Sequence, residues 1–385
     1  MSGEFWTGGL NEGFALEREV GFYDTTLRDG EQTVGVVLSP EDKLELAQGL
    51  DELGVERIEA GFPRVSEDDY RAVQLIAQAG LDAEIWGFSR AVAADVQALV
   101  ELNVKASVIE SPISDLKLAA LGVSREQMLE RITDAIANAT EHGIRVAFFG
   151  VDSTRAQPDY FAEVYRTAVE AGAQEVVVVD TIGIATPEAA EFLVRQTREW
   201  VGPDVPVHWH GHNDFGLATA CSLAAVKGGA RWIQGTINGM GERAGNANLA
   251  EIALALRGLY GVATNLRLER VRAFVDRLRA LSGYELEPFK PLFGDNLFTR
   301  ESGAVAAQFH EPEAIEPYAS DVVGAQRRVV LGKKSGIDSI RIKAQELGLE
   351  LTDDEQRRLL AEVKKRGTEK RGLVTDEEFR ELARG

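Results

Sequence analysis

Eight short apolar runs, rich in Val, Ile and Phe, alternate with longer stretches of helical pattern in the first part of the chain. Such runs are typical of strands buried on both faces, and strands separated by helices pair in parallel. The expected strands lie at 20–25, 57–62, 84–88, 105–110, 145–151, 175–180, 206–212 and 232–237. Eight such units in about 250 residues are typical of an α/β fold, the (β/α)₈ TIM barrel. An open doubly wound sheet is the alternative, but no Gly-rich dinucleotide-binding turn follows the first strand.

The alternation of strands and helices stops near residue 262. Before that point, the segment 124–143 opens on Ser124, and Gln127 three residues later completes a capping box, which predicts a helix. Beyond it, the chain returns to charged, helical sequence with no further run of strands. We therefore predict a catalytic barrel over residues 1–262 and a smaller, mostly helical C-terminal region with linker segments over 263–385.

The charge balance and the single cysteine exclude several classes of protein. The 42 Lys and Arg residues stand against 62 Asp and Glu residues, for a net charge of −20, which disfavours nucleic acid or an anionic membrane as a partner. Cys221, the one cysteine, cannot form an internal disulfide. The acidic N-terminus does not resemble a signal peptide, and no apolar run reaches the roughly 18 residues of a membrane span. We expect a cytoplasmic protein.

Polar residues gather where the expected strands end, which is where the chemistry of such barrels takes place. In the stretch "DTTLRDGEQ", Asp24, Arg28 and Asp29 follow the first strand. The other strands contribute Glu59, Ser89, Arg90, Asp152, Asp180, Thr181, His210, His212, Asn213, Asp214, Asn238, Glu242, Arg243 and Asn246. We predict that these side chains surround one site.

The stretch "HWHGHND" contains three of the five histidines of the protein. Residues two apart on a strand share one face, so His208, His210 and His212 are predicted to point the same way. Two imidazoles with a carboxylate from another strand suit a divalent metal that accepts nitrogen and oxygen ligands. A set of hydrogen-bonded histidines inside the barrel is the alternative.

Four motifs in the barrel region together resemble a known family. "DTTLRDGEQ", "IEAGFP", "HGHND" and "NGMGERAGNANL" are similar to motifs of the DRE-TIM metallolyase superfamily. The likeness is to its Claisen-condensing branch, which includes isopropylmalate, homocitrate and citramalate synthases, and it covers about residues 18–260. It implies a metal-dependent acyltransferase that condenses acetyl-CoA, or another acyl-CoA, with a 2-oxo acid. It also implies a homodimer whose C-terminal region covers the active site of the partner.

The resemblance implies roles for individual residues. A divalent metal (Mg²⁺, Mn²⁺ or Zn²⁺) would lie on Asp29, His210 and His212, with Asn246 as a further or nearby ligand. Among the remaining residues, Arg28 would hold the carbonyl or enolate oxygen, Gln32 and Glu59 would lie beside the reacting carbons, and Thr181 would bind the substrate carboxylate. Arg90 in "GFSRAV" would bind a distal acidic group of the substrate or pair with a neighbouring acid.

The C-terminal region departs from the pattern of this branch. Val305 and Ile315 stand where a histidine and a tyrosine are usual, and neither side chain transfers a proton. His310 and Tyr318 are nearby residues that would take over acid–base catalysis. Alternatively, His208 or Glu59 of the barrel would supply the base, or the reaction differs. The open alternatives are a metal-dependent carbon–carbon lyase or aldolase and an inactive homologue with a binding role.

Overall fold

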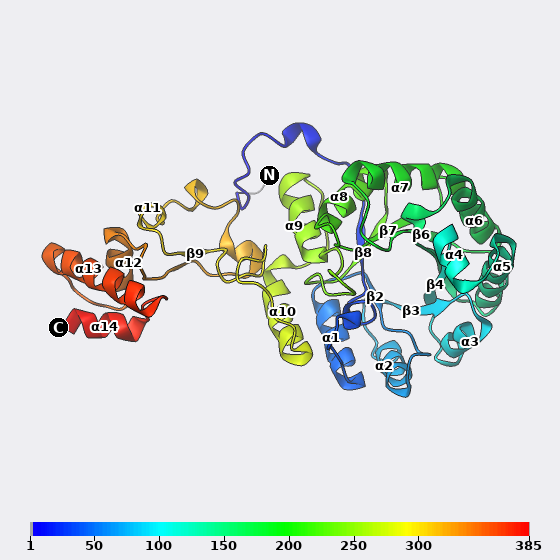
Figure 1. Ribbon diagram of the computed structural model, residues 1–385, viewed down its shortest axis with the longest axis horizontal. Coiled ribbons are helices and arrows are strands. Elements are labelled where there is room, and N and C mark those ends of the chain that lie inside the picture. The colour runs from blue at the N-terminus through cyan, green and yellow to red at the C-terminus, as the bar shows by residue number, and fades with distance from the viewer. Residues whose placement is uncertain (1–2, 385) are drawn as a thin grey trace. The chain divides into compact units, whose positions relative to one another are not determined.

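The computed structural model describes residues 3–384 and contains a closed barrel of parallel strands (Figure 1). Neighbours in the chain are neighbours in the barrel, and the last strand pairs with the first, Gly21 to Asp24 lying beside Trp232 to Gly235. The strands are β1 (Gly21–Asp24), β2 (Arg57–Glu59), β3 (Glu84–Arg90), β4 (Ala106–Pro112), β5 (Arg145–Val151), β6 (Glu175–Asp180), β7 (Val207–Gly211) and β8 (Trp232–Gly235). The predicted (β/α)₈ barrel is confirmed.

Helices connect the strands and surround them (Figure 1). They are α1 (Pro40–Glu52), α2 (Glu67–Ala77), α3 (Ala93–Glu101), α4 (Asp115–Leu121), α5 (Arg125–Glu141), α6 (Pro158–Glu170), α7 (Pro187–Val201), α8 (Ala218–Gly228), α9 (Leu249–Leu259) and α10 (Leu268–Ser282). α5 begins with the predicted capping box of Ser124 and Gln127. The sequence did not predict α4, which at seven residues is too short to show a clear helical period.

The interior of the barrel is filled by every second residue of its strands. On β4, Ala106 and Val108 are buried in one apolar cluster with Phe88 of β3 and Phe149 of β5. Since side chains two apart on a strand share a face, the next residue in each such series faces the mouth of the barrel. This alternation brings the residues at the strand ends together in one place.

The contacts divide the chain into two compact units, Asn11–Glu285 and a second unit made of Met1–Leu10 with Leu286–Gly385. The first unit holds the barrel, and α10 belongs to it because this helix packs against α1 and α9. The sequence placed the boundary at residue 262, in the connection before α10.

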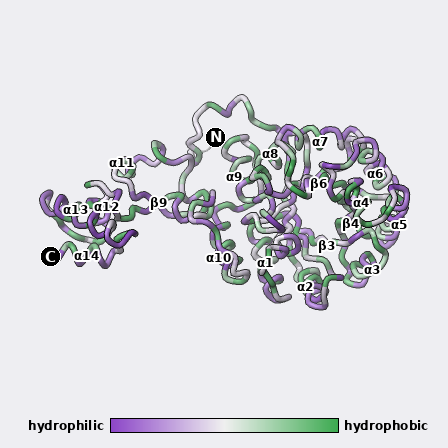
Figure 2. The backbone as a smooth tube through the Cα atoms, in the orientation of Figure 1, coloured by the Kyte–Doolittle hydropathy of each residue, from purple (hydrophilic) through white to green (hydrophobic). Residues whose placement is uncertain are grey.

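The second unit is mostly helical, with two short strands that pair in parallel. Its elements are β9 (Thr299–Arg300), α11 (Gly303–Ala306), β10 (Arg328–Val329), α12 (Ile337–Glu346), α13 (Asp353–Lys370) and α14 (Asp376–Arg384). Leu331, Ile340, Leu359, Val363 and Phe379 form its apolar core. α13 is otherwise rich in charged residues, and Figure 2 shows it as hydrophilic along most of its length. Within residues 3–384, no helix is both long and apolar enough to cross a membrane.

Candidate active site

Three predicted metal ligands meet at the mouth of the barrel. Asp29 lies in the turn after β1, and its amide donates to the carbonyl of Thr25 at 2.9 Å. Its Oδ2 lies 3.2 Å from Nε2 of His210 and 3.6 Å from Nε2 of His212, and the two Nε2 atoms are 3.4 Å apart. One carboxylate and two imidazoles, all buried, therefore surround a single point. The sequence spacing on β7 correctly placed the two histidines on one side.

The unsatisfied atoms around this point fit a divalent metal. Nδ2 of Asn246 donates to the carbonyl of Met240 at 3.1 Å, whereas its buried Oδ1 has no partner within the described residues. Oδ1 of Asp29 is also buried without a hydrogen bond in the described part of the chain. Asn246 pairs with His212 through a backbone bridge. Two nitrogens and two oxygens of this kind suit a borderline or hard divalent cation.

The protonation states also suit a metal. Burial alone would raise the pKa of Asp29, but Arg28 and the two histidines lower it well below its usual range, so the carboxylate is charged. Burial lowers the pKa of His212 to about 4, and this imidazole is therefore neutral near pH 7. Metal ligands must be deprotonated in this way before they can bind a cation.

Arg28 is held beside the three ligands by Glu59. Nε of Arg28 donates to Oε2 of Glu59 at 2.7 Å, and Oε1 of Glu59 accepts from the hydroxyl of Tyr23 at 3.1 Å. The guanidinium lies 4.2 Å from the ring centre of Phe88, and its Nη1 lies 3.6 Å from Oδ2 of Asp29. Nη2 has no partner in residues 3–384, so this donor is available to a ligand. Both oxygens of Glu59 are thus occupied, which suits a residue that orients Arg28.

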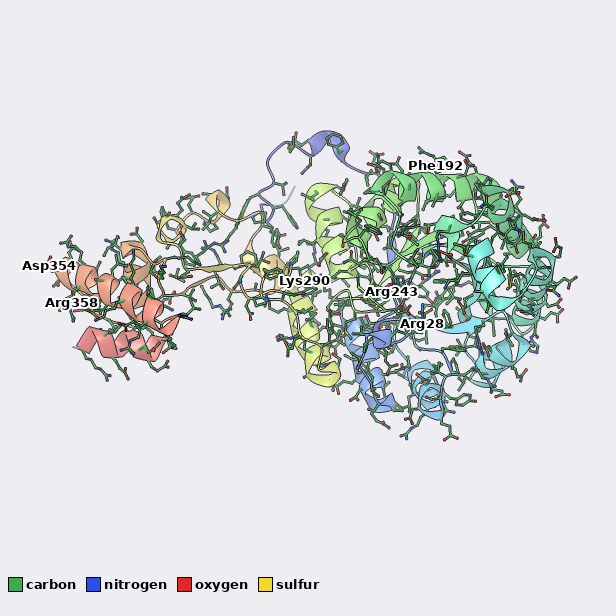
Figure 3. The ribbon with its side chains drawn as sticks, in the orientation of Figure 1. Arg28, Phe192, Arg243, Lys290, Asp354 and Arg358 are labelled. Atoms are coloured by element: carbon green, nitrogen blue, oxygen red, sulfur yellow. The ribbon has the colours of Figure 1, made fainter. Side chains whose placement is uncertain are left out.

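Gln32 follows β1, and Thr181 follows β6. Gln32 is exposed and lines a pocket of about 340 Å³ together with Arg28 and Lys43. Oγ1 of Thr181 accepts from the amide of Asp152 at 2.7 Å, and its carbonyl accepts from Nη2 of Arg243 at 2.7 Å. Figure 3 labels Arg28 and Arg243, both in the barrel unit.

Arg90 makes the local pair that the sequence left open. Its Nε donates to Oδ2 of Asp95 at 2.7 Å, and its Nη2 donates to Oδ1 of Asp95 at 3.1 Å. The side chain is 53 % exposed and lies over the ring of Phe62. Asp95 at the start of α3 is therefore the neighbouring acid with which Arg90 pairs.

His208 lies deeper in the barrel than the metal ligands. Its Nε2 lies 2.5 Å from Oε2 of Glu175, and its Nδ1 lies 3.1 Å from Nε2 of Gln234. Rings of Tyr23 and Trp86 pack against it, and none of its surface is exposed. Because both ring nitrogens are used inside the barrel, His208 neither contacts the mouth nor is available as a base. The contacts with Glu175 and Gln234 argue against both roles that the sequence suggested for His208, the base and a residue that binds the substrate.

The two residues predicted to replace the missing acid–base pair lie in the second unit. His310 is exposed. Tyr318 is 9 % exposed and packs between the rings of Phe5 and Phe298. Val305 on α11 and Ile315 are half-buried apolar residues of the same unit.

Sequence reasoning missed Glu110, at the end of β4. It is half-buried and lines a pocket of about 590 Å³ with Arg90, Lys117 and Arg131. The signal was present in the alternation of Ala106, Val108 and Glu110, which places a charge where an inward-facing residue is expected.

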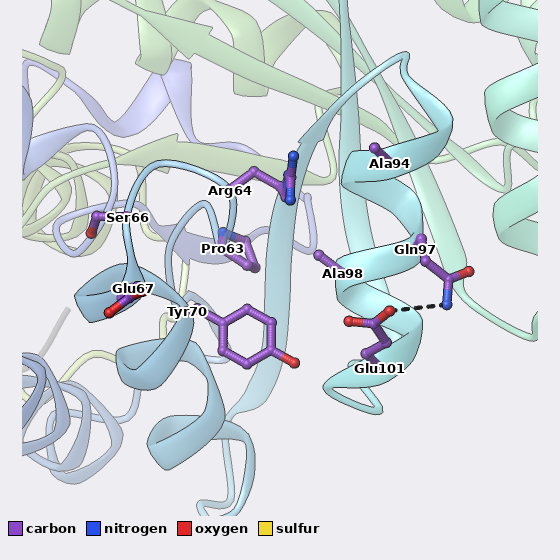
Figure 4. Close-up of a pocket in the computed structure, with 9 residues that line it drawn as sticks. All are labelled: Pro63, Arg64, Ser66, Glu67, Tyr70, Ala94, Gln97, Ala98 and Glu101. Atoms are coloured by element: carbon purple, nitrogen blue, oxygen red, sulfur yellow. Dashed lines mark hydrogen bonds between the residues drawn. The ribbon is translucent and has the colours of Figure 1, made fainter.

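Another pocket, of about 450 Å³, lies between α2 and α3 (Figure 4). None of the predicted site residues lines that pocket, and its walls include Arg64, Tyr70 and Glu101.

The raised pKa of Asp24, at the end of β1, predicts that the stability of the fold depends on pH. Burial raises its pKa to about 7, although the amide and hydroxyl of Thr26 donate to it at 2.8 and 2.9 Å. A carboxyl with a raised pKa stabilises the fold fully below its unfolded pKa, near 3.8, and this stabilisation is lost as the pH rises through about 7. We expect Asp24→Asn to remove a slope of at most about 1.4 kcal/mol per pH unit. Urea unfolding with chelator from pH 4 to 8 measures it; parallel curves for both proteins would contradict the assignment.

Comparison with known proteins adds two matched regions. The profile of the HMGL-like family matches residues 19–277, and a profile described as homocitrate synthase post-HMGL domain-like matches residues 292–371. The homocitrate synthase AksA of Methanopyrus kandleri is 44% identical over 371 residues, which cover 96% of this chain and 93% of that protein. The 2-isopropylmalate synthase of Methanocaldococcus jannaschii is 40% identical over 359 residues, which cover 92% of this chain and 68% of that protein.

A solved structure supports the barrel independently. The HMG-CoA lyase from Brucella melitensis superposes with a TM-score of 0.60 at 21% sequence identity. The match covers 69% of this chain and all of the lyase. At this level of identity the likeness concerns the fold.

Proposed function

Because this chain belongs to the HMGL-like family, we propose that it is a metal-dependent acyltransferase that condenses an acyl-CoA with a 2-oxo acid. Acetyl-CoA is the donor implied by the relatives named homocitrate synthase and 2-isopropylmalate synthase. The product would be a 2-hydroxy-2-alkyl dicarboxylate, released with free CoA. The observation that carries the proposal is the grouping of Asp29, His210 and His212 beside a charged, oriented Arg28.

A divalent metal on Asp29, His210 and His212, with Asn246 beside them, would polarise the ketone of the 2-oxo acid as a Lewis acid. Arg28 would then donate from its unpaired Nη2 to the oxygen on which negative charge develops. Glu59 and Phe88 fix the plane of the guanidinium, so little reorganisation is needed when the charge appears. Gln32 and Thr181 are proposed to contact the 2-oxo acid at the edge of the site.

The second unit contains His310 and Tyr318, the two residues predicted to carry out acid–base catalysis. We propose that exposed His310 protonates an oxygen during the reaction. The packing of Tyr318 between two aromatic rings favours a structural role for that residue. The resemblance to the condensing synthases supports a homodimer, which light scattering would test.

The relatives do not specify the acceptor, since two synthases named for different products match at 44% and 40% identity. A thiol-release assay with acetyl-CoA and Mg²⁺ or Mn²⁺ tests the reaction. The panel of acceptors is pyruvate, 2-oxoisovalerate, 2-oxoglutarate and oxaloacetate. We expect thiol release with one acceptor above the rate without it. A metal-loaded protein that releases no thiol with any of them would contradict the proposal, and carbon–carbon cleavage without thiol release would indicate a lyase.

A further inference from the structure

Glu110 is a carboxylate without a partner at the mouth of the barrel. It is paired in register with Arg90 of β3 and Phe149 of β5, and its backbone carbonyl accepts from Ala91. Among the described residues 3–384, its side chain forms no hydrogen bond and no ion pair. Ala106 and Val108, the preceding residues on the same face of β4, are buried in the interior cluster, so Glu110 faces the mouth.

The other carboxylates on or just after the barrel strands are already used, within the described chain. Glu59 is held by Arg28 and Tyr23, as described above. The remaining pairs are Asp24 with Thr26, Asp29 with Arg28, Glu84 and Glu175 with Arg57, Asp152 with Ser114 and Arg155, Asp180 with Thr154, and Asp214 and Glu242 with Arg243. A carboxylate that already accepts hydrogen bonds or pairs with a cation is a weaker proton acceptor. Glu110 has no such direct bond in the described part of the chain.

Glu110 is reachable by a long substrate. The pocket of about 590 Å³ that it lines has an apolar part, with Leu121, Met128 and Val151, and three cationic side chains. Those side chains are Arg90, Lys117 and Arg131. Apolar surface beside cations suits an acyl thioester arm that carries phosphates further along.

Glu110 is also close to the reacting centre. Phe149, its register partner on β5, lies against His210 with ring centres 5.1 Å apart. Burial raises the pKa of Glu110, whereas Arg28, Arg90 and Lys117 lower it and Asp95 raises it. The charge of Arg28 therefore acts on Glu110. A carboxylate made more basic by burial is better suited to removing a carbon-bound proton.

Resting on the proposed function, we propose that Glu110 is the base that removes the methyl proton of the acyl-CoA. Its carboxylate forms an O–H bond, and the electron pair of the broken C–H bond becomes the C=C bond of the enolate, with the charge on the thioester oxygen. The enolate carbon bonds to the ketone carbon, whose C=O electron pair moves onto oxygen and takes up the proton that His310 is proposed to supply. The proton on Glu110 returns to solvent, which restores the base. Hydrolysis of the thioester then releases CoA as the thiol.

Glu110→Gln tests this role, because it keeps the size of the side chain and removes its basicity. With the acceptor found for the wild type, we expect kcat to fall by about 10²- to 10⁴-fold and KM to stay within a few-fold. Glu130→Gln on α5, an exposed glutamate next to Arg131, is the matched control and is expected to keep wild-type kinetics. Exchange of the methyl hydrogens of acetyl-CoA with D₂O is expected to be lost in parallel.

A second variant separates catalysis from folding. If Glu110 is the base, added formate is expected to raise the rate of Glu110→Ala by at least about tenfold, because the small carboxylate replaces the missing one. If Glu110→Gln kept kcat within about threefold of the wild type and still exchanged the methyl hydrogens of acetyl-CoA, the role of Glu110 would be overturned. The proposed function would still stand. A Glu110→Ala protein that is folded and inactive, and that formate does not rescue, would also overturn the role of Glu110. A wild type that releases no thiol would instead overturn the proposed function.

Discussion

Arg28→Lys is expected to lower kcat/KM for thiol release by about 10²- to 10³-fold, the usual effect of losing an aligned donor to a developing oxyanion. A lysine cannot donate to Glu59 and keep a second, coplanar donor directed into the site, because its ammonium is a single point of charge. In the native protein one guanidinium does both, with Nε on Glu59 at 2.7 Å and Nη2 unpaired. The substitution leaves the net charge of the site unchanged. A fall in kcat/KM would therefore result from the lost direction of the guanidinium donors.

The matched control is Arg125→Lys. Arg125 also forms a two-point pair with a carboxylate, Asp115, at 2.8 Å for each bond, but it lies on the outer helices. We expect this variant to keep wild-type kinetics, and both variants to bind Mn²⁺ as the wild type does. If Arg28→Lys retained more than a third of wild-type kcat/KM, Arg28 would not be the group that stabilises the developing charge.

Glu175→Ala is expected to lower the free energy of unfolding by about 3–5 kcal/mol, because it leaves buried charged and polar partners unpaired. Oε2 of Glu175 accepts from Nη1 of Arg57 at 2.7 Å and contacts Nε2 of His208 at 2.5 Å, and Oε1 accepts from Nη2 of Arg57 at 3.0 Å. Burial alone would raise the pKa of Glu175, but His208 and Arg57 lower it well below its usual range. Arg57 also lies over the rings of Trp86 and Trp232.

Urea unfolding at pH 7 measures this effect. Glu163→Ala, which removes an exposed glutamate from α6, is the control and is expected to change the free energy of unfolding by less than about 0.5 kcal/mol. Glu175→Gln keeps one acceptor oxygen and is expected to lose less than Glu175→Ala. Equal stability of Glu175→Ala and Glu163→Ala would show that the network contributes nothing to the fold.

Much of the barrel could be predicted from the sequence because the evidence for it is local. Each strand is a short apolar run, and helix starts such as Ser124 with Gln127 depend on residues three apart. The convergence of Asp29, His210 and His212 also followed, since residues at the carboxyl ends of parallel strands face one mouth.

The sequence did not predict how deep in the barrel each inward-facing side chain lies. His208 shares a face with His210 and His212, as its spacing requires, yet it ends in the interior with Glu175 and Gln234. Alternation gives the direction of a side chain, whereas its height depends on the stagger between neighbouring strands. That stagger is a property of the closed barrel.

The sequence by itself determined the barrel, its order of strands and the set of polar side chains at its mouth. Each of these follows from local patterns, namely the short apolar run of a strand and the polar residues that come directly after it. Only the tertiary structure decided which of these side chains are paired and which are free. Glu59 is tied to Arg28 and Tyr23, Arg90 to Asp95, and His208 to Glu175, whereas Glu110 is unpaired among the described residues. The physical reason is that a hydrogen bond requires two groups within about 3 Å, and that distance is set by packing between segments far apart in the chain.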